Sequence, residues 1–70
     1  MNEQTSDKVR RMIDLLPEDQ REVLILRHYA DLSFKEISQL TGCSINTALG
    51  RMRYGLLNLR KMMEEKQIAL

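Results

Sequence analysis

The stretch Ser33 to Ser44, SFKEISQLTGCS, decides how this chain folds, because it carries a helix start, a helix stop and a second helix start. Ser33 and Glu36 have the spacing of a capping box, which predicts a helix that begins after Ser33. Gly42 adopts the left-handed conformation at low cost, so the helix should end there. Ser44 is a favoured N-cap residue and should open the next helix two residues later. Two helices joined by so tight a turn predict a helix-turn-helix unit.

Capping residues and a proline before this unit predict two further helices, so we expect an all-α, four-helix domain. Ser6 or Asp7 can cap the first helix, and Pro17 both ends it and suits the first turn of the second. The chain has no repeat and no Gly/Ser linker, so all 70 residues are expected to form a single domain, with residues 1–6 as a flexible start. The four helices are expected over about residues 7–16, 17–29, 33–42 and 44–66.

The apolar positions of the last two helices predict how they pack. In the third helix, Phe34, Ile37 and Leu40 should face inward. Ile37, Cys43 and Ala48 should form a small core between the third and fourth helices. In the fourth helix an apolar stripe recurs every three or four residues, and it consists of Ile45, Ala48, Met52, Leu56, Leu59 and Met63.

Charge is unevenly distributed, although the formal net charge is only +1. The first 43 residues carry six basic and eight acidic side chains, whereas residues 44–63 carry four basic and no acidic ones. The helix dipole accounts for Arg60 and Lys61 near the helix end, but not for Arg51 and Arg53. A locally basic helix on a nearly neutral domain indicates contact with a polyanion.

The composition disfavours several other classes of protein. One cysteine and one histidine exclude an internal disulfide and fall short of the four ligands of a structural zinc site. No catalytic arrangement or glycine-rich phosphate loop is present, so we expect no enzyme activity, cofactor, metal or small-molecule substrate. No apolar run approaches the ~20 residues of a membrane span, and the polar first residues do not form a signal peptide. A cytoplasmic protein without a membrane contact is expected.

Once the apolar stripe is removed, the fourth helix keeps a polar face suited to the major groove of DNA. Asn pairs with adenine, Thr touches the thymine methyl group, and Arg either grips phosphate or reads guanine. Thr47 is equally consistent with a role confined to the helix cap. Lys35 is a candidate for contact with the DNA backbone, whereas surface charge is the better interpretation of Arg27. The outward residues are Asn46, Thr47, Gly50, Arg51, Arg53, Tyr54 and Asn58.

From Leu16 to about Met63 the chain resembles region 4, the C-terminal promoter-binding domain of bacterial RNA polymerase sigma factors, most closely of the extracytoplasmic-function group. The resemblance rests on LPEDQREVLILR, on LSFKEISQLTG, and on Ser44, Thr47 and Arg51. It implies a four-helix domain whose last helix lies in the major groove of the promoter −35 element, in double-stranded DNA. It also implies docking on the flap of the polymerase β subunit, and possible binding of an anti-sigma factor. The candidate DNA-contact residues are Lys35, Ser44, Asn46, Thr47, Gly50, Arg51, Arg53 and Tyr54.

The chain departs from the family pattern within the fourth helix. It has Ala48 and Leu49 where a valine–lysine pair is common, Gly50 where serine is common, and Tyr54 and Leu56 where basic residues are common. Two alternatives therefore stay open. One is a free-standing regulator like the output domain of response regulators. The other is a helical module that binds an anti-sigma factor or polymerase without reading DNA itself.

Overall fold

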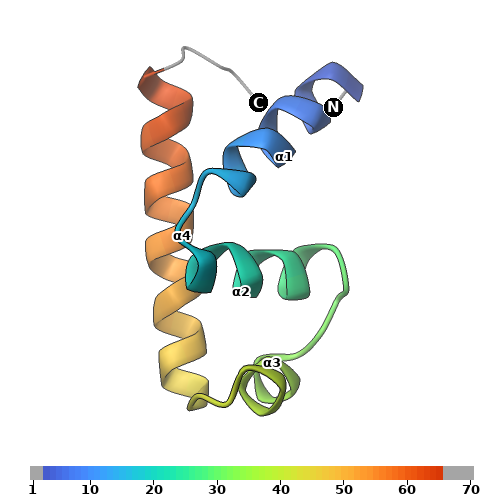
Figure 1. Ribbon diagram of the computed structural model, residues 1–70, viewed down its shortest axis with the longest axis vertical. Coiled ribbons are helices and arrows are strands. Elements are labelled where there is room, and N and C mark those ends of the chain that lie inside the picture. The colour runs from blue at the N-terminus through green and yellow to red at the C-terminus, as the bar shows by residue number, and fades with distance from the viewer. Residues whose placement is uncertain (1–2, 66–70) are drawn as a thin grey trace.

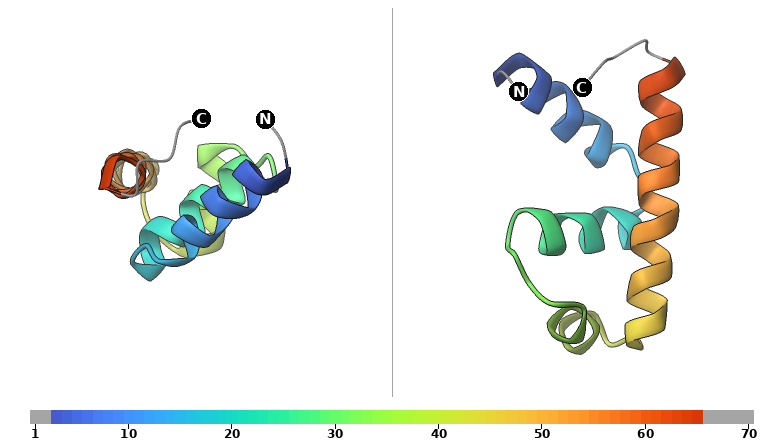
Figure 2. Two further views of the ribbon diagram at one scale, coloured as in Figure 1. Left: turned by 90° about the horizontal axis from the view of Figure 1, so that it is seen from above. Right: turned by 180° about the vertical axis from the view of Figure 1, so that it is seen from behind.

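The computed structural model describes the backbone of residues 3–65 and the side chains of residues 7–65. This part of the chain contains four helices and no strand, which confirms the all-α prediction. The helices are α1 (Glu3–Asp14), α2 (Glu18–His28), α3 (Phe34–Thr41) and α4 (Ile45–Glu65). α4 spans the molecule, and α1, α2 and α3 lie one after another along it (Figure 1 and Figure 2). At 1.5 Å per residue, the 21-residue α4 is about 31 Å long, which accounts for most of the 35 Å long axis.

The first helix begins earlier than the sequence predicts. α1 extends back to Glu3, so the expected caps Ser6 and Asp7 lie inside it. The reason is local, because no glycine or proline interrupts this part of the chain. α1 ends at Asp14, two residues before the predicted end, and Leu16 is buried beyond the helix. α1 thus begins closer to the N-terminus than the predicted capping residues indicated.

Pro17 separates α1 from α2, and α2 begins one residue later than the predicted start at Pro17. Its φ of −52° and ψ of 147° make it the N-cap of α2, and the first helical residue is Glu18. The carbonyl oxygen of Pro17 accepts the first helical bond from the N–H of Arg21 at 2.9 Å. α2 ends at His28 with Tyr29 as its C-cap, in agreement with the predicted end.

The capping signals around α3 are confirmed. The N–H of Glu36 donates to Ser33 Oγ at 3.1 Å, and the N–H of Ser33 donates to Glu36 Oε1 at 3.0 Å. Gly42 closes the helix with a φ of 70°, in the left-handed region. These bonds join residues only three or four positions apart, which is why the sequence pattern alone locates both ends of α3.

Two groups of buried side chains form the core. The first joins α1, α2 and α4, and consists of Met12, Ile13, Leu16, Leu24 and Leu59. The second joins α2, α3 and α4, and consists of Val23, Ile37 and Ala48. Cys43 packs against this second group, so the predicted core of the helix-turn-helix is confirmed. Met52 contacts both groups and connects the two halves of the core.

Three predicted inward positions are wrong. Leu40 is 67% exposed, because α3 turns the side of Phe34 and Ile37 toward the core and Leu40 lies off that side. Ile45, at the start of the predicted stripe of α4, and Leu56 further along it are also exposed. Helical spacing alone assigns more residues of α4 to the core than the three short helices cover. The predicted end of α4 at Lys66 lies outside the described residues.

The two glycines of α4 have different surroundings. A glycine inside a helix costs roughly 1 kcal/mol relative to alanine, and the sequence leaves open whether such a residue has a packing role. At Gly55 an added Cβ would lie 3.1 Å from Leu24 Cδ1 and 3.4 Å from Gln20 Cβ. At Gly50 it would meet nothing within 4 Å. Gly55 therefore permits the close approach of α2, whereas Gly50 leaves the surface of α4 open.

Candidate nucleic-acid interface

The N-terminus of α4 is built by Ser44. The N–H of Thr47 donates to Ser44 Oγ at 3.0 Å, and the N–H of Ala48 donates to the Ser44 carbonyl oxygen at 3.0 Å. The Ser44 hydroxyl donates to Thr47 Oγ1 at 2.9 Å. Ser44 thus uses its hydroxyl for the cap, while the exposed Thr47 hydroxyl retains its own proton for an external acceptor. The free N–H groups and positive dipole of this helix end favour a phosphate nearby.

An exposed polar face runs from this end along the first half of α4. Asn46, Thr47, Arg53 and Tyr54 are all exposed, and Gly50 between them leaves the backbone partly accessible. The exposed side chains lie on successive turns of one helix, so a single groove could receive them together. The structure therefore brings together five of the eight candidate DNA-contact residues as one continuous surface.

Arg51 lies at the edge of this face and has a partner within the chain. Its Nε is 3.7 Å from Oδ2 of Asp19, in the first turn of α2. The Arg51 side chain is 31% exposed. Its charge is therefore partly balanced in the absence of DNA, and no local sequence pattern predicts this pair.

Asn58, predicted to face outward, is half-buried and contacts α2. Its Nδ2 donates to Oε1 of Gln20 at 2.8 Å. The prediction for this residue is wrong, because α2 crosses α4 close to Gly55 and covers the neighbouring position. Asn58 therefore contributes to helix packing and is not part of the exposed face.

Lys35 and Arg27 occupy different settings. Lys35 is exposed in the first turn of α3, on the other helix of the helix-turn-helix, and forms no ion pair with a described side chain. Arg27 donates from Nη1 to the Leu32 carbonyl oxygen at 3.0 Å and lies 5.1 Å from the centre of the Phe34 ring. Arg27 thus fastens the loop between α2 and α3, whereas Lys35 keeps its ammonium group free for a partner.

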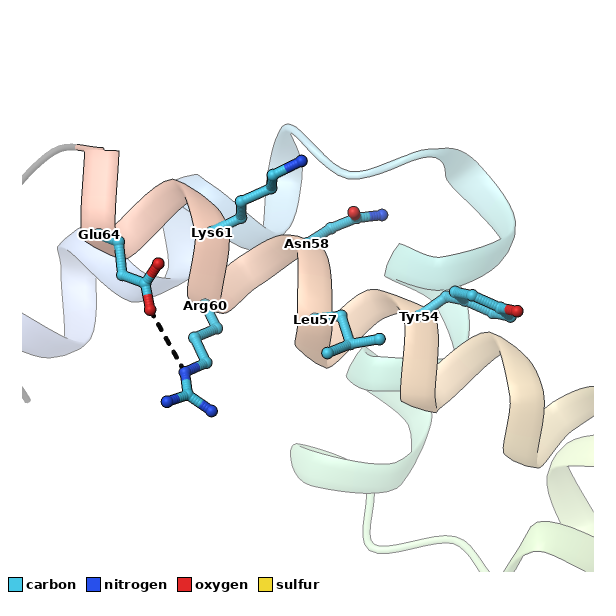
Figure 3. A pocket seen from close by; sticks show the side chains of 6 residues that line it. All are labelled: Tyr54, Leu57, Asn58, Arg60, Lys61 and Glu64. Atoms are coloured by element: carbon cyan, nitrogen blue, oxygen red, sulfur yellow. Dashed lines mark ion pairs between the residues drawn. The ribbon is translucent and has the colours of Figure 1, made fainter.

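A second exposed surface lies further along α4, and of the residues that line it only Tyr54 was among the predicted DNA contacts. It is an open depression of about 430 Å³. Figure 3 shows the side chains that line it, which are Tyr54, Leu57, Asn58, Arg60, Lys61 and Glu64. Arg60 Nε pairs with Glu64 Oε1 at 3.4 Å. Leu57 is 56% exposed and lies three residues after Tyr54. A leucine on the polar side of the helical wheel was the signal in the sequence for this surface.

Other titratable and metal-binding groups add little to this interface. Two hydrogen bonds from Ser33, the larger effect coming from its backbone N–H, hold the pKa of Glu36 below its ordinary value of 4.5. The part of the chain that the structure describes contains no cluster of side chains suited to a metal ion. In the same part, no helix is long and apolar enough to cross a membrane.

Two similarities to known proteins agree with this arrangement. Residues 6–53 match the family described as Sigma-70, region 4. Over 67 residues the chain is 37% identical to the RNA polymerase sigma factor YlaC of Bacillus subtilis (strain 168). That alignment covers 90% of this chain and 39% of the relative, so the chain spans well under half of that protein's length. Both similarities confirm the resemblance found in the sequence.

Proposed function

Because the chain belongs to the Sigma-70, region 4 family, we propose that it recognises the −35 element of promoters and positions RNA polymerase for transcription initiation. The observation that carries the proposal is the exposed polar face at the start of α4, the second helix of the helix-turn-helix. The role is positional, and no catalytic step is part of it. Neither similarity supports the alternatives of a response-regulator-like protein or of a module that does not read DNA.

The first half of α4 would lie in the major groove. Asn46 and Thr47, near the helix N-terminus, would reach base edges, and Arg53 would hold a phosphate. Tyr54 would pack on the sugar–phosphate backbone. Lys35 on α3 would contact the backbone flanking the groove. Ser44 would act through the cap, by fixing the helix end that faces the phosphate.

RNA polymerase would supply much of the effective affinity. A single DNA-binding module buries roughly 600–1,000 Å² on DNA, and phosphate contacts dominate its affinity. With a net charge of +1, this chain has few such contacts to offer. Tethering to the polymerase, through the flap of the β subunit, would raise the local concentration at the promoter. In this proposal residues 1–70 act as one domain in the cytoplasm, and an anti-sigma factor would compete for the domain.

The test is a titration of the 70-residue chain with duplex DNA, followed by fluorescence anisotropy. The preferred duplex is first selected from a pool with a randomised centre, and binding is then measured at about 50 and about 200 mM salt. We expect sequence-selective binding, and a salt slope that falls by about 0.9 in Arg53→Ala, because one phosphate contact is lost.

Arg60→Ala is the matched control, since Arg60 lies two turns further along α4 and pairs with Glu64. Its salt slope should stay close to that of the wild type. Absence of any selected sequence would overturn the proposal, whether or not the chain binds DNA at low salt. Equal slopes for the two variants would remove Arg53 from the interface.

A further inference from the structure

The first turn of α2 lies against α4 beside the exposed polar face. Gly55 permits this approach, because any Cβ there would press on Leu24 and Gln20. Gln20 then accepts a hydrogen bond from Asn58 at 2.8 Å, across 38 positions of sequence. The start of α2 is thereby held against α4 at Gly55 and Asn58, one and two turns after Arg51.

This packing brings Asp19 to Arg51. Asp19 Oδ1 accepts the N–H of Gln20 at 2.9 Å, which orients the carboxylate, and Oδ2 lies 3.7 Å from Arg51 Nε. Nε is the inner nitrogen of the guanidinium group. The four remaining N–H donors belong to the two Nη groups at the tip of the side chain.

The acidic first turn of α2 determines which DNA group suits this tip. A phosphate bound to Arg51 would lie within several ångströms of the Asp19 carboxylate, with Glu18 in the same turn, and like charges repel. The major-groove edge of guanine instead offers O6 and N7, two neutral acceptors that match a bidentate arginine. The surroundings of Arg51 therefore disfavour a phosphate and tolerate a base edge.

We infer that Asp19 is a positioning residue that keeps Arg51 off the DNA backbone and directs its Nη groups to O6 and N7 of a guanine. The inference rests on the proposed function and goes beyond it, because it assigns one arginine to base reading and names the residue that orients it. Arg53 provides the contrast. It is exposed and pairs with no acidic side chain among the described residues, so it is suited to a phosphate.

The experiment is selection from the randomised duplex pool with the wild type, Asp19→Asn, Arg51→Lys and Glu18→Gln, followed by titration against salt. The wild type should prefer guanine at one position by roughly 5- to 150-fold. Asp19→Asn should lose that preference and bind unselected duplexes more tightly, with a slope steeper by up to about 0.9, because Arg51 becomes free for a phosphate. Arg51→Lys should lose the guanine preference with little change in the salt slope, because lysine keeps the positive charge but lacks the bidentate guanidinium group.

Glu18→Gln is the matched control, because it removes the same charge from the same turn without contacting Arg51. It should keep the guanine preference. Thermal unfolding of each variant excludes a loss of fold as the cause. A guanine preference that survives in Asp19→Asn, or a selected site without a guanine that depends on Arg51, would overturn this inference and leave the proposed function intact. A wild type that selects no sequence would overturn both.

Discussion

At the scale of single residues, contact with α2 separates positions of α4 that look alike in the sequence. Gly50 and Gly55 have the same intrinsic helix propensity, yet only Gly55 is buried against another helix. Arg51 and Arg53 carry the same charge, yet only Arg51 pairs with an aspartate. On α4, two residues of the same type can therefore have different roles. The role of each depends on whether it contacts α2.

The two glycines give a prediction about stability. Gly50→Ala should stabilise the domain by about 0.5–1 kcal/mol, because the helix propensity improves and the new methyl group meets nothing. Gly55→Ala gains the same propensity but presses on Leu24, a strain of about 1–3 kcal/mol, so the net change should be neutral to destabilising. Urea unfolding of the two variants measures the difference. Equal stabilisation by both would contradict the close approach of α2.

At the scale of elements, the ends of α3 and α4 depend on short hydrogen bonds. The capping box of Ser33 and Glu36 starts α3, Gly42 ends it, and Ser44 starts α4. These bonds place α3 and α4 across a turn only three residues long. The orientation of the exposed face of α4 therefore depends on local chemistry as much as on the core.

The capping box predicts a pH dependence. Because the pKa of Glu36 is lowered in the folded protein, its contribution to stability is present above the ordinary value of 4.5 and is lost as the pH falls below it. Glu36→Gln removes this titration and should flatten the loss of stability between about pH 6 and about pH 3. Thermal unfolding of wild type and variant across that range measures the effect. Glu22→Gln, on the exposed side of α2, is the control. Parallel curves for wild type and Glu36→Gln would show that the box does not couple to stability.

At the scale of the whole molecule, two small cores are joined through Met52 and the length of α4. Neither core is large, and a domain of this size buries only about 60% of the surface that its unfolded chain exposes. Each half therefore depends on the other for stability. We expect the described helices to unfold as one cooperative unit, so that the helix-turn-helix is stable only while α1 and α2 are packed.

Ile37→Val tests this cooperativity. Removal of one buried methylene at Ile37, which is fully buried, should cost about 0.5–1.5 kcal/mol. Although Ile37 lies in the second core, the amides of α1 should lose hydrogen-exchange protection by the same amount as those of α3. Native-state hydrogen exchange measures both sets in one experiment. A loss confined to α3 and α4 would mean that the two halves unfold separately.

The sequence by itself determined the helix-turn-helix, the number of helices and the polar character of the first half of α4. It could do so because capping boxes, left-handed glycines and helical spacing are interactions between residues at most four positions apart. These signals correctly predicted the helix ends at Ser33, Gly42 and Ser44. They also predicted the exposed face that contains Asn46, Thr47 and Arg53. The start of α1 was placed too late, because an uncapped polar segment carries no such signal.

Only the tertiary structure decided how α2 lies on α4. Asp19 meets Arg51, and Gln20 meets Asn58, across more than thirty positions of sequence. No local pattern encodes these pairs, because they exist only once Gly55 lets the two helices approach and the two cores fix their crossing. The same packing turned Asn58 inward and left Leu40 and Leu56 in solvent. The exposure of each residue thus depends on how much of a helix surface its neighbouring helices cover. Helical periodicity narrows the set of residues that can be buried, but it does not say which of them are covered.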